Sequence, residues 1–471
     1  MTERRLSARE VVARVADEAS FTELPAPAGK SGSGQPDGPL SWQGYDACRA
    51  RARERTGEEE SVVCGTATVE GTRAVLLAFE FGFLGGSLGE RTGDRLESAY
   101  IYARAHRLPV VPLVATGGSR MQEGMLALTQ LQRVARQSIL TRDAGLPQIA
   151  VLRDPTTGGG WATLGAGADI TLALPTAQIG FAGSRVRPPD ADPTAYTAEA
   201  QVAAGAADSV VRPEELRGVL GRWLGLLAGP TAPGSTVQRL APEAPAGTAP
   251  PPPAPLGARD LPATGWDAVQ RARAARRPRA EAYLSAYFEH RVPISGDRCG
   301  GADPEGMLCG FGAHEGRTVA YAAQTGTATR PAGYRTAARL VRLADRLGIP
   351  VLTLVDTPGA ANDAEAERQG VGASIADLFG AVAGARVPIT TLVIGEGGSG
   401  GALALAAPGN TWATPDSYFS VIAPELAAAI LKRGPREVEA TADQLRIRPQ
   451  DLVELGVIRG VVGGPMSEGT P

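Results

Sequence analysis

The sequence predicts an α/β protein built from two similar domains. Three observations support this fold class. Each half alternates short apolar runs with amphipathic or small-residue runs, in the order strand, loop, helix, strand, loop, helix. Each apolar run ends at a glycine-rich loop. A proline-rich stretch separates the halves.

The repeat is visible in the spacing of prolines. Pro109 and Pro147 lead into apolar β-branched runs in the first half, and Pro350 and Pro388 do so in the second. Both pairs are 38 residues apart, and the halves are offset by 241 residues. A register kept over this length indicates a duplicated domain.

Two stretches predict the domain boundaries. Residues 24–40 mix Pro, Gly and Ser, and residues 227–264 are proline-rich with little to bury. We therefore expect an N-terminal helix and flexible segment at 1–40, a first domain at 41–226, a linker at 227–264 and a second domain at 265–471.

The strands are predicted in the apolar runs that follow these prolines. In the first half they end at "VATGGSR" and "DPTTGGGWATL", and in the second at "VDTPGA" and "IGEGGSGG". A helix is expected at 121–140 after the first loop, and "GALALAA" is expected to be helical after the last. Ligand sites in α/β folds lie at these carboxyl ends of strands.

The glycine loops occupy equivalent places in the two halves. At an offset of 241, Gly118 matches Gly359, and the pair 159–160 matches the pair 400–401. Glycine lets the backbone approach a ligand closely, and free N–H groups at a helix start attract negative charge. Such loops can hold a phosphate, pack tightly against a neighbour, or form an oxyanion hole.

Phosphate binding is the weakest interpretation. No G-x-x-x-x-G-K-[ST] motif occurs, and "GEGGSGG" lacks the acidic residue expected about 20 positions after a dinucleotide fingerprint. Packing stays open for any single loop. The repetition of two loops in each half favours an oxyanion hole.

Catalytic side chains are scarce around these loops. None of the three histidines lies in one, and Ser399 has no base in any motif. Glu123 and Glu396 could act as acid or base, although Glu123 also suits the first turn of a helix. The pattern indicates enolate stabilisation, with the proton taken by something other than a protein side chain.

Composition excludes other classes of function. The net charge of −3 and pI of about 5.9 provide no basic field for nucleic acid. The four cysteines lack C-x₂-C spacing, so no metal and no zinc are predicted. The charged N-terminus and the lack of an apolar run of roughly 18 residues predict a cytoplasmic protein without membrane insertion.

Longer motifs carry a family resemblance. The first half contains "FEFGFLGGSLGERTGDRLESA" and "ATGGSRMQEGMLALTQ", and the second contains "PAGYRTAARLVRLADRLGIPVLTLVDTPGA" and "VIGEGGSGGALALA". Over residues 41–225 and 265–464 the chain resembles the carboxyltransferase component of acetyl-CoA carboxylase, with the bacterial β and α subunits fused.

The resemblance implies two tandem crotonase-like (ClpP/crotonase) spiral domains and a biotin-dependent acyl-CoA carboxyltransferase. In that reaction carboxybiotin on a carrier protein releases CO2 and takes the α-proton of a CoA thioester, whose enolate then attacks CO2. Two oxyanions form, one on the thioester and one on biotin. The thioester hole would use Gly117, Gly118, Gly158 and Gly159, and the biotin hole Gly400, Gly401 and Ala402 with Gly359 and Ala360.

The resemblance also implies substrate cations and partners. Arg120 is the best-placed candidate for the CoA phosphates, although it could equally cap a helix or pair with Glu123; Arg91, Arg185 and Arg330 lie beside family-like motifs. No biotinyl-lysine motif or ATP-binding region occurs, so biotin carboxylase and the biotin carrier are expected as separate chains. The site would form between the first domain of one chain and the second domain of a partner, in a homo-oligomer (dimer or hexamer).

Departures from the family pattern concern the substrate channel. "DTPGAAND" stands where the family has "DTPGAYPG", and the segment before "PAGYR" is short. They leave the acyl chain length open, as well as primary or secondary metabolism. Two alternatives remain: a malonyl-thioester decarboxylase on the same scaffold, and a non-catalytic scaffold subunit.

Overall fold

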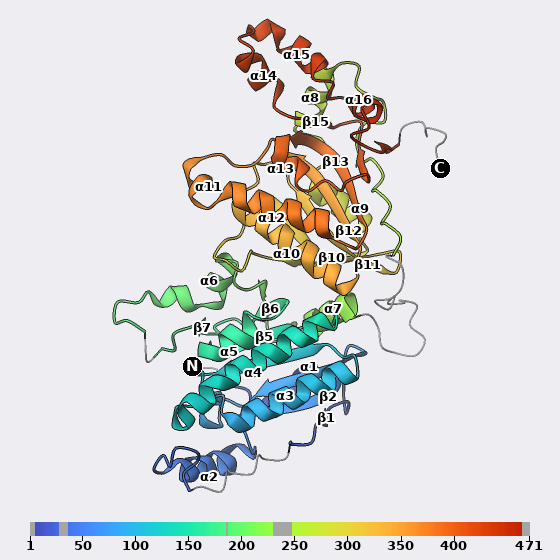
Figure 1. Ribbon diagram of the computed structural model, residues 1–471. Coiled ribbons are helices and arrows are strands. Elements are labelled where there is room, and N and C mark those ends of the chain that lie inside the picture. Colours follow the sequence, from blue (N-terminus) through green and yellow to red (C-terminus); the bar gives the residue numbers. More distant parts are fainter. Residues whose placement is uncertain (1–4, 28–35, 185–186, 229–246, 464–471) are drawn as a thin grey trace. The chain divides into compact units, whose positions relative to one another are not determined.

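The computed structural model describes residues 5–27, 36–184, 187–228 and 247–463 (Figure 1). The chain divides into two compact units, Met1–Arg239 and Leu240–Pro471. Each unit contains one eight-stranded sheet with helices packed on it. The predicted mixed α/β architecture with two tandem domains is confirmed.

The first sheet has the strand order β1-β2-β3-β4-β5-β6-β8, and β7 pairs with the end of β5. The strands β1, β2 and β3 pair antiparallel, and from β3 onward the neighbours are parallel. The strands are β1 (Thr22–Glu23), β2 (Val62–Val69), β3 (Thr72–Phe79), β4 (Val110–Thr116), β5 (Ile149–Thr157), β6 (Ile170–Ala173), β7 (Ile179–Gly180) and β8 (Ser209–Val210).

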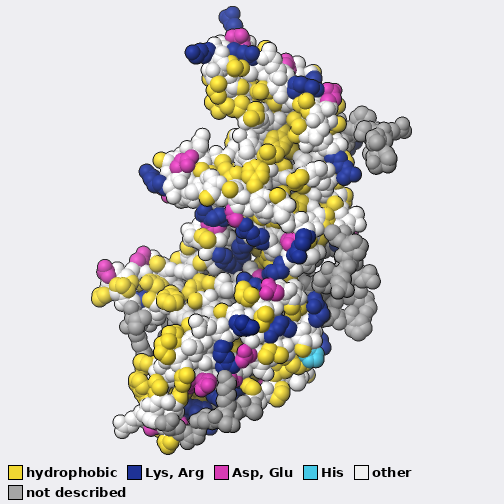
Figure 2. Space-filling model, in the orientation of Figure 1, with side chains coloured by type: hydrophobic (Ala, Val, Ile, Leu, Met, Phe, Trp, Pro, Cys, Tyr) yellow, Lys and Arg dark blue, Asp and Glu magenta, His cyan; other side chains and the backbone are white. Residues whose placement is uncertain are grey.

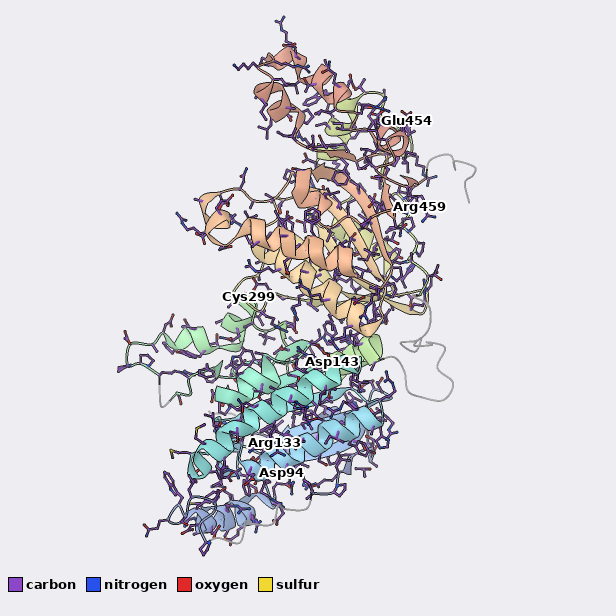
Figure 3. All side chains as sticks on the ribbon, in the orientation of Figure 1. Asp94, Arg133, Asp143, Cys299, Glu454 and Arg459 are labelled. Atoms are coloured by element: carbon purple, nitrogen blue, oxygen red, sulfur yellow. The ribbon has the colours of Figure 1, made fainter. Side chains whose placement is uncertain are left out.

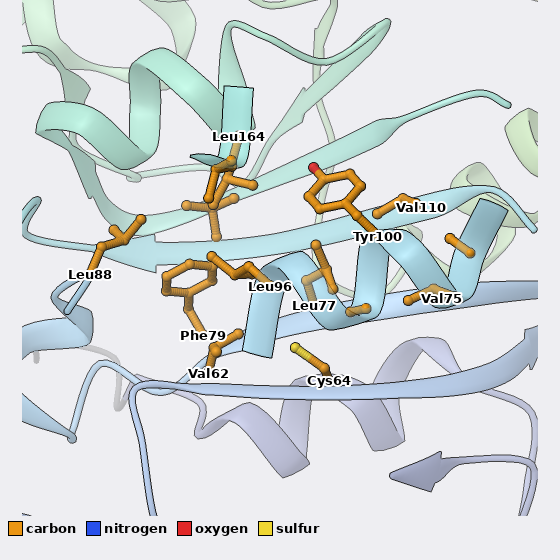
Figure 4. Close-up of a cluster of buried hydrophobic side chains, with 14 of the residues drawn as sticks. Val62, Cys64, Val75, Leu77, Phe79, Leu88, Leu96, Tyr100, Val110 and Leu164 are labelled. Atoms are coloured by element: carbon orange, nitrogen blue, oxygen red, sulfur yellow. The ribbon is translucent and has the colours of Figure 1, made fainter. Parts of the chain in front are cut away.

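Helices α3 and α4 pack on this sheet and enclose its core. Apolar side chains of α3 meet those of β2, β3 and β4 in one buried cluster (Figure 4). Arg133 of α4 pairs with Asp94 of α3 at 2.9 Å and joins the two helices on their outer side (Figure 3). The helices are α1 (Ala8–Val15), α2 (Tyr45–Thr56), α3 (Glu90–Ala105), α4 (Gly124–Asp143), α5 (Gly158–Gly160), α6 (Ala198–Ala203) and α7 (Leu216–Ala228), with short helices η1 (Leu84–Gly86), η2 (Met121–Glu123), η3 (Trp161–Gly165) and η4 (Pro193–Tyr196).

The N-terminal helix expected within residues 1–40 is α1. Ser7 and Glu10 form a capping box at its start, which satisfies two of the free N–H groups there. Val11 and Val15 are fully buried, and β1 pairs with β2. Both elements therefore contribute to the first unit.

The second sheet repeats the first. Its order is β16-β14-β13-β12-β11-β10-β9, and β15 pairs with the end of β13 as β7 does with β5. The strands are β9 (His290–Ile294), β10 (Met307–His314), β11 (Arg317–Gln324), β12 (Val351–Thr357), β13 (Ile389–Gly398), β14 (Thr411–Ala413), β15 (Tyr418–Ser420) and β16 (Gly460–Val461). Equal order in both sheets is the structural counterpart of the proline repeat.

The long helix of the second unit is α10 (Pro331–Leu347). Its first residue is Pro331, whose fixed φ suits the first turn of a helix. Gly348 ends it in the left-handed conformation with φ of 67°. The other helices are α8 (Gly265–Arg273), α9 (Ala280–Tyr287), α11 (Ala364–Arg368), α12 (Val371–Gly384), α13 (Ser399–Leu403), α14 (Pro424–Ile430), α15 (Val438–Gln444) and α16 (Pro449–Glu454), with η5 (Pro435–Glu437).

Two predicted segments differ from the structure or lie partly outside it. The helix expected over "GALALAA" ends at Leu403, because the following backbone bonds elsewhere: Thr353 Oγ1 donates to the Leu405 carbonyl at 3.0 Å. The expected linker 227–264 begins inside α7, and residues 229–246 are outside the described residues. Beyond them, the Pro250 carbonyl accepts from Thr390 Oγ1 at 2.6 Å, so this part packs on the second unit.

A buried ion pair joins the ends of β12 and β13. Arg277 donates to both carboxylate oxygens of Asp356, at 2.9 and 2.8 Å, and to the carbonyl of Ile394 at 2.7 Å. Asp356 also accepts from the N–H of Glu396 at 3.1 Å. Because both loops of the second unit follow directly, this pair fixes their starting points.

Arg277→Met is expected to lower the free energy of unfolding by about 3–5 kcal/mol, because it leaves the Asp356 carboxylate buried without its partner. Chemical denaturation followed by circular dichroism measures this. The matched control is Arg386→Met, which breaks an exposed pair with Asp345 and should change little. Equal effects of the two variants would contradict the role given to Arg277.

Candidate functional site

The two loops of the first unit touch at the carboxyl ends of β4 and β5. Gly118 and Gly158 have φ of 110° and 63°, a region that favours glycine. A Cβ on Gly158 would lie 3.1 Å from the Cα of Gly118. The two backbones approach this closely because neither residue has a side chain.

Several N–H groups predicted as donors in this unit are used by the fold. The N–H of Gly117 donates to the Gly85 carbonyl at 2.9 Å, that of Gly118 to Thr116 Oγ1 at 3.0 Å, and that of Gly158 to the Phe181 carbonyl at 3.1 Å. These three groups therefore shape the loops.

Gly159 is placed to donate. It is the second residue of α5, so no carbonyl one turn earlier is available to its N–H group. A Cβ on it would lie 2.4 Å from Leu131 Cδ1, so a larger residue would require the Leu131 side chain to move.

The structure adds Ser119, which the sequence argument missed. Leu88 donates to the Gly118 carbonyl at 2.9 Å and accepts from the N–H of Arg120 at 2.8 Å. In such a parallel bridge the residue between Gly118 and Arg120 directs its own N–H away from Leu88. The N–H of Ser119 therefore faces the side opposite Leu88.

The same arrangement recurs in the second unit. The N–H of Gly359 donates to Thr357 Oγ1 at 3.1 Å. Thr329 donates to the Gly359 carbonyl at 3.2 Å and accepts from the N–H of Ala361 at 2.9 Å. The N–H of Ala360 therefore points away from Thr329, just as that of Ser119 points away from Leu88.

Helix α13 brings further donors to Ala360. Ser399, Gly400 and Gly401 are its first three residues, so their N–H groups have no carbonyl within the helix. A Cβ on Gly401 would lie 2.7 Å from the Ala360 nitrogen, so the two segments are in direct contact. A Cβ on Gly400 would meet nothing within 4 Å, so this side is open to a ligand. Ala402 is fourth in the helix, where the first intrahelical bond closes, so its predicted role as a donor is not supported.

Glu396 is held by its neighbours. Its Oε2 accepts from Arg273 Nε at 2.9 Å and from the Tyr418 hydroxyl at 2.8 Å. Arg273 also pairs with Glu425 at 2.5 Å. These contacts tie α8, β15 and α14 to the end of β13, so Glu396 shapes the loop.

Arg120 does not bind substrate phosphate from its position here. Its side chain is 0% exposed and donates to Glu60 Oε2 at 3.1 Å and Glu123 Oε1 at 3.3 Å. Burial raises the pKa of Glu60, but Arg120 outweighs it and lowers that pKa below its usual value. The expected pairing with Glu123 is the alternative that the structure shows. The Tyr45 hydroxyl donates to the same Glu123 oxygen at 2.5 Å, which ties α2 to this cluster.

The other predicted cations differ in availability. Arg91 is half-buried on the first turn of α3, and within the described residues its Nη1 has no hydrogen-bond partner. Arg330 is exposed before α10 and pairs with Asp363 at 2.9 Å. Arg185 lies outside the described residues.

Two kinds of feature are absent from the described ranges. No three His, Cys, Asp or Glu side chains come together there as a metal site. No helix in those ranges combines the length and the apolar character needed to cross a bilayer.

Comparison with known proteins decides the family. The chain is 38% identical over 440 residues to the acetyl-coenzyme A carboxylase carboxyl transferase subunits beta/alpha of Saccharopolyspora erythraea, covering 89% of this chain and 74% of the relative. The chain belongs to the carboxyltransferase family of acetyl-CoA carboxylase. The protein of the same description from Salinispora arenicola is 38% identical over 483 residues, covering 98% and 83%.

Both halves match models of this carboxyltransferase family. Residues 38–206 match the carboxyl transferase domain, and residues 261–470 match the acetyl co-enzyme A carboxylase carboxyltransferase-like family. The crystal structure of transcarboxylase 12S has a TM-score of 0.77 and 20% identity, covering 97% of this chain and 87% of that one. The chain therefore shares the crotonase-like carboxyltransferase fold.

Gly401→Val is expected to reduce carboxyltransferase turnover at least 100-fold, because its side chain would separate α13 from Ala360 and displace open donors. The far-ultraviolet circular dichroism should not change. Gly380→Val is the matched control, since a Cβ at this position of α12 meets nothing within 4 Å. Equal loss of folded signal and activity would mean that the glycine serves packing alone.

Proposed function

We propose that this chain transfers a carboxyl group from carboxybiotin, held on a separate carrier protein, to the α-carbon of acetyl-CoA or a related acyl-CoA. The observation that carries the proposal is the pair of matching backbone sites. Each unit brings N–H groups of a strand-end loop and of a helix start together at one edge of its sheet. Such donors stabilise an oxygen that becomes negative during a reaction.

The side chains present fit this chemistry. Glu396 is engaged with Arg273 and Tyr418, and Glu123 is buried with Arg120, so neither is free to take a proton. When bound, carboxybiotin supplies both the carboxyl group and the base. The contribution of the protein is then to orient two substrates and to stabilise charge.

Each unit would serve one oxyanion. In the first unit, the N–H groups of Gly159 and Ser119 would hold the thioester oxygen of the acyl-CoA. In the second, those of Gly400, Gly401 and Ala360 would hold the oxygen of biotin. Loss of one such donor costs roughly 2.7–4 kcal/mol in the barrier.

Arg91 and Arg330 are the cations we assign to the CoA phosphates. The Nη1 group of Arg91 is buried and has no partner in the described residues, and Arg91 lies three residues after Leu88, which bridges Ser119. Arg330 follows Thr329, which bridges Ala360, and its side chain is 45% exposed. Guanidinium groups pair well with phosphate oxygens.

We further propose a homo-oligomer and two partner proteins, biotin carboxylase and the biotin carrier. Transcarboxylase 12S, whose fold this chain shares, assembles as a hexamer and its crystal structure contains hydrolysed methylmalonyl-coenzyme A, which supports oligomerisation here. Exposed apolar side chains gather over α14 (Figure 2). They are Val421, Leu426, Ile430 and Leu431.

The test is reconstitution from purified proteins. This chain, biotin carboxylase, biotinylated carrier, ATP and labelled bicarbonate should label acetyl-CoA or another acyl-CoA, and labelling should require the carrier. Absence of label with every acyl-CoA would overturn the proposal. Carbon dioxide released from malonyl-CoA without the carrier, together with no labelling, would identify a decarboxylase instead.

A further inference from the structure

One buried side chain joins the two loops of the second unit. Gln324 is the last residue of β11 and is 0% exposed. Its Nε2 donates to the Gly401 carbonyl at 3.1 Å and to Thr329 Oγ1 at 3.3 Å. One amide therefore contacts α13 directly and the loop of Ala360 through Thr329, which bridges Ala360.

The contact to Gly401 completes a short helix. Helix α13 has five residues, and its last carbonyls lack the partners of a longer helix. The N–H of Leu405 bonds to the Ala402 carbonyl at 3.2 Å and so leaves the Gly401 carbonyl to Gln324. Gly401 has no side chain to hold it by packing, so this hydrogen bond fixes its orientation.

The contact to Thr329 reaches the other loop. The backbone of Thr329 bonds on both sides of Ala360 and sets the direction of its N–H group. Tyr334 closes the cluster, because its buried hydroxyl would lie 2.5 Å from a Cβ on Gly401. Burial raises the pKa of Tyr334 far above its usual value, so the hydroxyl stays neutral.

The first unit has no such amide at this place. Ala323 pairs with Leu354 and Ala78 with Leu113, so the residues that follow, Gln324 and Phe79, take equivalent positions. Phe79 is buried in the apolar core. The contact between Gln324 and Gly401 therefore has no counterpart at the Phe79 position of the first unit.

We propose that Gln324 is a positioning residue that sets the N–H groups of Ala360, Gly400 and Gly401 relative to one another by holding Thr329 and Gly401 together. This inference rests on the proposed function, in which these groups serve the biotin side. Loss of the amide would then slow carboxyl transfer and leave the thioester side intact. Small displacements of such groups are costly, because the stabilisation depends on precise placement.

The experiment uses the full-length chain and Gln324→Met, which keeps the length of the side chain and removes the donor. The expected result is a kcat for carboxyl transfer lower by about 10- to 100-fold with KM for the acyl-CoA within twofold. Gln369→Met is the matched control, since Gln369 is exposed and its amide donates to Glu365 on the same helical segment, and its kcat should match the wild type.

A second variant distinguishes a positioning effect from loss of folding. In Gln324→Glu only the protonated acid can donate to the Gly401 carbonyl, so transfer should fall as pH rises through the pKa of the new carboxyl, a step that the wild type lacks. Wild-type kcat in Gln324→Met, or no new step in the pH profile of Gln324→Glu, would overturn the positioning role. Failure of the wild type itself to transfer would instead overturn the proposed function.

Discussion

The close approach of a strand-end loop to a helix start is the constraint on which the rest of the structure depends. Gly158 lies against Gly118 in the first unit, and Gly401 lies against Ala360 in the second; a Cβ on Gly158 would lie 3.1 Å from the Gly118 Cα, and one on Gly401 2.7 Å from the Ala360 nitrogen. Because the backbones touch, N–H groups from two different segments face one place. Two parallel strands with a fixed register are needed to hold them there, and the duplicated sheet provides that frame twice.

The sequence predicts this frame well because the signals for it lie in short stretches of the chain. Strands, glycine loops and the offset of 241 residues are properties of short stretches, and the structure confirms the duplicated α/β fold. Which N–H groups stay free is not visible in the sequence. Thr116 and Thr357 end their strands at the same offset, and each accepts from the glycine two residues later. A threonine two residues before a loop glycine is a usable signal of such a bond.

Contacts between residues far apart in the sequence explain why the surroundings of Arg120 and Gln324 were not predicted. Arg120 stands beside a glycine loop in the sequence, but Glu60 and Tyr45, far earlier in the chain, enclose it with Glu123. The same holds for Gln324, which meets Gly401 across 77 residues. The two units thus share a backbone plan and differ in what holds it: the Arg120 cluster supports a loop of the first unit, whereas the Arg277–Asp356 pair and the Gln324 amide support the loops of the second.

We propose that backbone N–H groups, rather than side chains, stabilise the charge in both units. A crystal structure of the assembled protein with acyl-CoA and biotin bound tests it most directly. We expect the thioester oxygen within about 2.7–3.1 Å of the nitrogens of Gly159 and Ser119, and the biotin oxygen at the same distance from those of Gly400 or Gly401 and Ala360. Either oxygen bound to a side chain, away from these loops, would contradict it.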